Sequence, residues 1–201
     1  MSFTRIAAVV LVILAAVGLY LVIFSGTPEP ETPKISGDSS SSVGDPEDVL
    51  VMELDGGEVR INLRPDLAPK HVERLKTLTR QGFYDGIVFH RVIDGFMAQT
   101  GDPTGTGTGG SDLPDLPAEF SDAPFKRGVL GMARTNDPDS ANSQFFITFD
   151  DASHLNGKYT VFGEVAEGMD LVDKIKKGAD DSGLVNEPDK IIRMRVAADI
   201  Q

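Results

Sequence analysis

Arg91 and Gln99 interrupt runs of apolar residues in the stretch 89–102, which reads FHRVIDGFMAQTGD. The Asp-Gly pair at its centre favours a tight turn, so the stretch is predicted to form two short strands joined by that turn. Alternate residues of a strand share a face, which places Met97 and Gln99 on the same side. An arginine, a glutamine and bulky apolar side chains then line one concave, half-polar surface. The alternative is a pair of amphipathic strands whose polar residues only face water.

The chain offers few other reactive groups. It contains no cysteine, which excludes disulfides, thiol catalysis and cysteine metal sites. His71, His90 and His154 are far apart and match no metal-ligand spacing, so we expect a structural role for each and no metal or other cofactor. The chain has 31 acidic and 19 basic residues, a net charge of −12 and no long Lys/Arg run, which argues against a nucleic-acid partner.

The elements that would position the central stretch follow from hydrophobic periodicity and turn signals. Alternating runs over 49–54 and 58–63, around an Asp-Gly-Gly turn, predict a β-hairpin. A helix is predicted from Pro69 to Arg80, with proline in its first turn and Gly82 just beyond its end. A shorter helix is predicted over 169–177. Further strands are predicted over 128–133, 143–149 and 159–165, and at the end of 189–199.

The segment 100–110 is rich in glycine and contains a G-x-G-x-x-G pattern at Gly105, Gly107 and Gly110. Such a pattern holds a phosphate only where a helix begins directly after it. Pro114 and Pro117 follow closely, so no long helix begins there and dinucleotide binding is not expected. The segment is predicted to be a flexible surface loop or, alternatively, to line a peptide groove.

Residues 6–24 carry no charge and would form a helix about 28 Å long, close to the hydrocarbon thickness of a bilayer. Arg5 precedes this run and acidic residues follow it. The positive-inside rule therefore places residues 1–5 in the cytoplasm and the rest on the extracytoplasmic, periplasmic side. The alternative is a cleaved signal peptide and secretion to the periplasm. We favour an uncleaved anchor, because the run is long for a signal sequence and no A-x-A site follows it.

Residues 25–48 are rich in proline and serine and hold few aliphatic side chains, so they are predicted to form a disordered linker. The linker leads to a globular domain over 49–201. Four motifs in this domain resemble the cyclophilin family of peptidyl-prolyl cis-trans isomerases, and the short loops between them resemble bacterial members. The motifs are FHRVIDGFMAQTGD at 89–102, GMAR at 131–134, SQFFIT at 143–148 and HLNGKYTVFG at 154–163. The resemblance implies a mainly β fold, a closed eight-stranded antiparallel barrel capped by two α-helices, here preceded by the N-terminal transmembrane helix.

The resemblance also carries functional residues to this chain. Arg91 matches the family's catalytic arginine, and Gln99 matches the glutamine that supports this arginine and the substrate backbone. The residues that match the floor and walls of the proline pocket are Phe96, Met97, Phe146 and Leu155. Positions along the peptide groove are matched by Ala133, Arg134 and Gln144, and Tyr159 stands where many members place a histidine.

Two positions depart from the family pattern. His154 replaces a tryptophan found in the members most sensitive to cyclosporin, which argues against strong binding of that drug. Arg134 replaces an asparagine common in eukaryotic members, at a position whose groove contact is expected from the backbone.

The implied activity is isomerisation of X-Pro bonds in proline-containing polypeptides, by non-covalent stabilisation of the twisted amide. Twisting this bond must overcome a barrier of about 18–20 kcal/mol and needs no nucleophile. We expect a monomer that contacts the membrane through its N-terminal helix. The alternative is a chaperone or proline-peptide binding module without turnover. The presence of both Arg91 and Gln99 argues against a mere binder, which needs only the apolar pocket.

Overall fold

The computed structural model describes residues 45–200, which hold the region predicted to be globular apart from its last residue. The segment predicted to be cytoplasmic (1–5), the predicted membrane anchor (6–24) and the linker up to residue 44 lie outside the described residues. Between residues 45 and 200, no helix is both long and apolar enough to cross a membrane.

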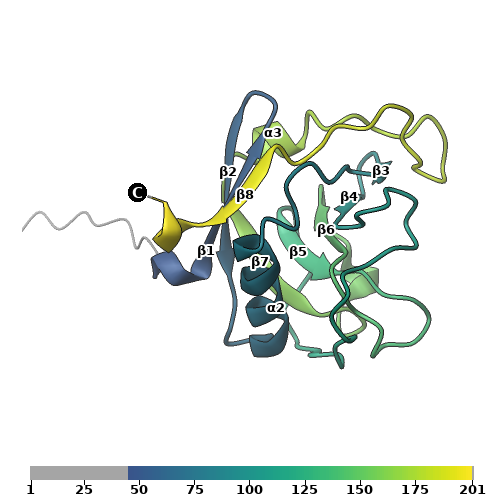
Figure 1. Ribbon diagram of the computed structural model, residues 1–201. Coiled ribbons are helices and arrows are strands. Elements are labelled where there is room, and N and C mark those ends of the chain that lie inside the picture. Colours follow the sequence, from purple (N-terminus) through teal and green to yellow (C-terminus); the bar gives the residue numbers. More distant parts are fainter. Residues whose placement is uncertain (1–44, 201) are drawn as a thin grey trace, which may run out of the picture. The chain divides into compact units, whose positions relative to one another are not determined.

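One antiparallel sheet of eight strands carries most of the domain (Figure 1). The strands are β1 (Val49–Leu54), β2 (Gly57–Leu63), β3 (Arg91–Ile93), β4 (Met97–Thr100), β5 (Val129–Met132), β6 (Phe145–Thr148), β7 (Val161–Glu167) and β8 (Arg193–Val196). Their order across the sheet is β3-β4-β6-β5-β7-β2-β1-β8. The described part also contains the helices α2 (Pro69–Arg80) and α3 (Met169–Val172) and the 3-10 helices η1 (Pro46–Asp48), η2 (Ser153–Leu155) and η3 (Ala197–Asp199).

The predicted closure of the barrel is wrong, because the end strands β3 and β8 do not pair with each other. Irregular chain bridges the gap between them: Phe89 N donates to Asp189 O (2.8 Å) and Val92 N donates to Gly183 O (2.7 Å). Gly183 and Glu187 adopt positive φ values of 72° and 51°, which break the extended run that leads into β8. The sheet is therefore an open half-barrel of eight strands.

The two helices pack at different places on the sheet (Figure 1). Along α2, the apolar residues Val72, Leu75 and Leu78 are buried in the main core. The short helix α3 lies by the β1–β2 hairpin. It ends earlier than predicted, and beyond it the Lys176 N–H donates to the Asp189 carboxylate (2.8 Å) instead of continuing a helical ladder.

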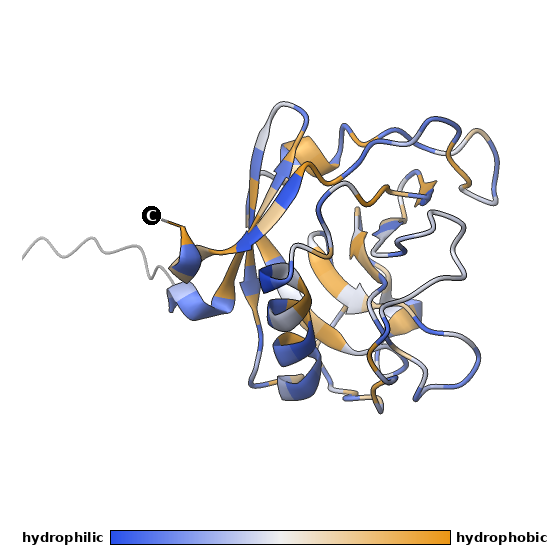
Figure 2. Cartoon of the chain, in the orientation of Figure 1, coloured by the Kyte–Doolittle hydropathy of each residue, from blue (hydrophilic) through white to orange (hydrophobic). Residues whose placement is uncertain are grey.

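Strand alternation gives the β4–β6 part of the sheet two hydrophobic faces. Ala98 and Ile147 are fully buried in the main core, which fills the inside of the half-barrel. Their neighbours Met97 and Phe146 point to the opposite face, as expected for a period of two. There they join a second, smaller cluster that also contains Phe125, Ala152, Leu155 and Val161. In Figure 2 the central strands are largely hydrophobic, while the viewed side of α2 is largely hydrophilic.

Candidate active site

The strand register brings the central polar residues together. Arg91 on β3 pairs with Gln99 on β4, and Gln99 pairs with Phe146 on β6. Paired residues of antiparallel strands project to the same face. Met97 lies on this face as well, two residues before Gln99, as predicted. Three adjacent strands therefore present an arginine, an amide and apolar side chains side by side.

A pocket of about 350 Å³ lies over this face. Its lining contains every predicted site residue except Gln144, together with His154: Arg91, Phe96, Met97, Gln99, Ala133, Arg134, Phe146, His154, Leu155 and Tyr159. The pocket floor is rigidly packed, because Met97, Phe146 and Leu155 are buried in the second cluster. The ring of Phe146 stacks on the fully buried Phe125 at 5.6 Å.

Gly131 on β5 is required for this floor, although no role was predicted for it from the sequence. It pairs with Phe146 in the strand register. A Cβ atom at Gly131 would lie 2.5 Å from Cζ of Phe146 and 2.6 Å from Cε1 of Phe125. Glycine is therefore the residue that allows both rings to approach the strand.

Arg91 is the first member of a chain of hydrogen bonds. Arg91 Nη1 donates to Gln99 Oε1 at 3.4 Å, a long contact, and Gln99 Nε2 donates to Gln144 Oε1 at 2.9 Å. Gln144 Nε2 donates in turn to two backbone carbonyls, Gly107 O (3.1 Å) and Gly109 O (2.8 Å). Each amide orientation is thus set by the next partner. Both side-chain N–H groups of Gln144 are used within the protein.

A second contact fixes Arg91 from the other side. Arg91 Nε donates to Ser182 O at 3.0 Å, in the irregular chain that precedes β8. This partner could not be predicted from the sequence, because Ser182 lies far along the chain and contributes only a carbonyl group. Between residues 45 and 200, no carboxylate pairs with Arg91.

The glycine-rich segment is held by Asp102, a fully buried carboxylate. Asp102 accepts hydrogen bonds from Thr104 N (2.7 Å), Thr104 Oγ1 (2.8 Å) and Gly107 N (2.6 Å). Burial raises the pKa of Asp102, but hydrogen bonds from Thr104, Gly109 and Gly107 outweigh it and lower the pKa to about 2. The segment is thus anchored from within. The contact with Thr104 N is an Asx-turn, in which an aspartate accepts from the backbone two residues on, so Asp102 itself was the available turn signal in the sequence.

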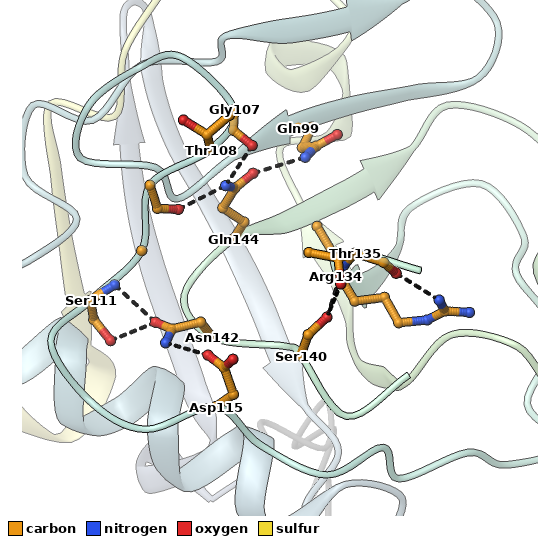
Figure 3. Close-up of a pocket in the computed structure, with 13 residues that line it drawn as sticks. Gln99, Gly107, Thr108, Ser111, Asp115, Arg134, Thr135, Ser140, Asn142 and Gln144 are labelled. Atoms are coloured by element: carbon orange, nitrogen blue, oxygen red, sulfur yellow. Dashed lines mark hydrogen bonds between the residues drawn. The ribbon is translucent and has the colours of Figure 1, made fainter. Parts of the chain in front are cut away.

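This segment forms one wall of a second pocket of about 450 Å³, which shares Gln99, Ala133 and Arg134 with the first (Figure 3). Its lining also includes Gln144, the only predicted site residue absent from the first pocket. The expectation that residues 100–110 line a groove is therefore the better of the two alternatives. At the far end, Asn142 Nδ2 donates to Asp115 Oδ1 (2.9 Å) and Asn142 Oδ1 accepts from Ser111 (Figure 3).

The histidines lie in three different surroundings. His71 is fully buried, with Nδ1 2.7 Å from Glu119 Oε2. His90 is buried beside the glycine segment, and burial lowers the pKa of both His71 and His90, which favours the neutral imidazole in each. His154 is exposed at the pocket edge, 5.2 Å from the ring of Phe96. Over residues 45–200, no group of His, Asp and Glu side chains is arranged to hold a metal ion.

Comparison with known protein families identifies the family to which the sheet and its pocket belong. Residues 49–196 match the family model described as cyclophilin type peptidyl-prolyl cis-trans isomerase/CLD. The chain belongs to the cyclophilin-type peptidyl-prolyl cis-trans isomerases. A probable peptidyl-prolyl cis-trans isomerase of Brucella suis is 56% identical to this cyclophilin in an alignment 172 residues long, which covers 80% of this chain and 88% of the relative.

Solved structures agree with this membership. Cyclophilin AquaCyp293 from Hirschia baltica superposes with a TM-score of 0.70 at 29% identity, over 78% of this chain and 76% of that one. A cyclophilin-type isomerase of Cryptosporidium parvum, crystallised in the presence of the dipeptide Ala-Pro, gives a TM-score of 0.67 at 29% identity, over 74% and 98%. This cyclophilin is a peptidyl-prolyl cis-trans isomerase that acts on proline-containing polypeptides.

Proposed function

We propose that this cyclophilin accelerates X-Pro isomerisation by binding the twisted amide more tightly than either planar form, with no covalent step. The proline ring would occupy the first pocket over Met97, Phe146 and Leu155, with Phe96 beside it. Because the first three side chains are buried and packed, the ring would be held still while the rest of the peptide turns about the bond.

Arg91 would donate to the prolyl nitrogen, whose lone pair localises as amide resonance is lost. Contacts with Gln99 and Ser182 use two of its five N–H groups, which leaves three for a substrate. One charge-assisted hydrogen bond made only in the twisted state would supply about 1.5–3 kcal/mol, roughly a 10- to 150-fold rate increase. The observation that carries the proposal is this permanently charged donor, free of any carboxylate partner within residues 45–200, at the rim of an apolar pocket.

Methionine methyl NMR tests where the proline binds, because Met97 lies in the pocket whereas Met52 and Met194 lie in the main core. During titration with an Ala-Pro-containing peptide, the Met97 methyl signal is expected to shift, while those of Met52 and Met194 stay in place. Both control residues are buried in the main core. Shifts confined to residues outside the pocket would contradict the proposal. Peptide binding without accelerated exchange would instead indicate a binding module.

We further propose that residues 6–24 anchor the protein in a membrane and leave the isomerase domain on the extracytoplasmic, periplasmic side. The charge-free run, Arg5 before it and acidic residues after it support this. The full chain should stay with bacterial membranes after a high-salt wash, and protease added to spheroplasts should degrade its domain. A soluble form that begins shortly after Ser25 would show that the segment is a cleaved signal. We also propose that the domain is a monomer, which light scattering would test.

A further inference from the structure

Arg134 and Tyr159 form a cationic rim where the two pockets meet. The guanidinium carbon of Arg134 lies 4.5 Å from the centroid of the Tyr159 ring, a cation–π distance. Tyr159 packs edge-on against Phe146, with centroids 5.8 Å apart and planes at 83°. The wall of the first pocket therefore holds this positive charge beside the position proposed for the proline ring.

The contacts of Arg134 leave its charge uncompensated. Nε and Nη2 donate to Lys158 O (3.3 and 2.9 Å), and Nη1 donates to Thr135 O (2.9 Å). These acceptors are neutral carbonyls, and they use three of the five N–H groups, so two remain for a ligand. The acidic residues of the following loop are engaged elsewhere. Asp137 accepts from Asp139 N, and Asp139 accepts from Ala118 N.

Arginines elsewhere on the domain are mostly paired. Five of them form ion pairs with carboxylates at 2.6–3.2 Å: Arg64, Arg80, Arg127, Arg193 and Arg195. Within the described residues, neither Arg91 nor Arg134 has such a partner, and no carboxylate lines the first pocket. In a chain with a net charge of −12, the proline pocket is therefore a local region of positive charge.

We propose that Arg134 selects clients that carry a glutamate or aspartate close to the isomerised proline. This inference rests on the proposed function, because it assigns a substrate class to the same site. The carboxylate of Asp115 lies at the far end of the second pocket and would repel an acidic client residue placed there. The acidic client residue that we expect to be favoured is therefore one that binds near Arg134. An exposed pair of opposite charges is expected to change kcat/KM by about two- to fivefold. The effect decreases with salt, because the screening length is about 10 Å at 0.1 M.

The test measures isomerisation of peptides in which Glu, Gln or Lys replaces, one at a time, each of the residues that flank proline. At one position or more, we expect kcat/KM to fall in the order Glu, Gln, Lys at low salt and to converge at high salt. Arg134→Gln should abolish this ranking, whereas Arg134→Lys, which keeps the charge, should retain it.

Arg60→Gln is the matched control for overall charge. Arg60 lies on β2, lines neither groove pocket and forms no ion pair within residues 45–200, so its removal should leave the ranking intact. Equal kcat/KM values for the Glu, Gln and Lys peptides, or a ranking that persists in Arg134→Gln, would overturn the role proposed for Arg134 and leave the proposed function standing. A chain that isomerises none of the peptides would overturn the proposed function itself.

Discussion

Gln144 is predicted to act on catalysis through Gln99 and Arg91, although it faces the groove. Replacing Gln144 with Met keeps the side-chain length and removes the three hydrogen bonds that join Gln99 to the glycine segment. The Gln99 amide would then be free to turn, and Arg91 would lose its fixed side-chain partner. A net hydrogen-bond contribution of about 0.5–1.5 kcal/mol corresponds to a two- to twelvefold loss of kcat/KM.

A double-mutant cycle decides whether the two glutamines act in series. Exchange rates of a proline peptide would be measured by NMR for Gln99→Met, Gln144→Met and the double variant, with thermal unfolding as a check that each variant folds. If Gln144 works by orienting Gln99, the double variant should be no slower than Gln99→Met alone. The loss should appear in kcat, because a supporting residue does not hold the peptide.

If the loss of kcat/KM in the double variant equals the product of the two single losses, the reasoning is refuted, since Gln144 would then act independently of Gln99. A change in KM with an unaltered kcat would also refute it. That result would mean that Gln144 contacts the peptide directly, which is the groove role that the family resemblance implies for it.

The other predictions concern the pocket floor and the glycine segment. Gly131→Ala should lower both activity and stability, the latter by about 1–3 kcal/mol, because the new methyl group displaces the Phe146 and Phe125 rings; unchanged unfolding and turnover would contradict this. Asp102 should stabilise the fold by about 2 kcal/mol above pH 4, since its pKa is about 2 when folded against about 3.9 unfolded. The unfolded state binds more protons between these values, so this stabilisation is lost as the pH falls from about 4 to about 2. Denaturant unfolding of Asp102→Asn should therefore show a deficit near pH 6 that vanishes near pH 2, and a deficit independent of pH would be the contrary result.

The hairpin around Arg91 and Gln99 was predictable because its signals are local. The Asp-Gly turn and the alternation on either side set the register that pairs these residues. The helix 69–80 was equally accessible, since proline at its start and a row of apolar residues mark both its position and its buried face. In such elements, the residues that determine the structure are neighbours in the chain.

The features that were missed depend on long-range geometry. The gap between β3 and β8 follows from positive φ values at Gly183 and Glu187, and a non-glycine residue in that conformation leaves no reliable mark in a sequence. The Ser182 carbonyl reaches Arg91 across 91 positions. Gly131 looks like any strand glycine until the register places it against Phe146. Such constraints arise only when distant segments meet.

The most direct test of the account is cis–trans exchange of an Ala-X-Pro-Phe peptide, measured by NMR with residues 49–201 and with the Arg91→Ala and Arg91→Lys variants. The account predicts fast exchange with the unaltered domain. It also predicts a loss of roughly 10- to 150-fold in Arg91→Ala, with incomplete recovery in Arg91→Lys, whose point charge lacks the planar donor geometry. Fast exchange retained in Arg91→Ala would leave the enzyme intact and contradict the mechanism.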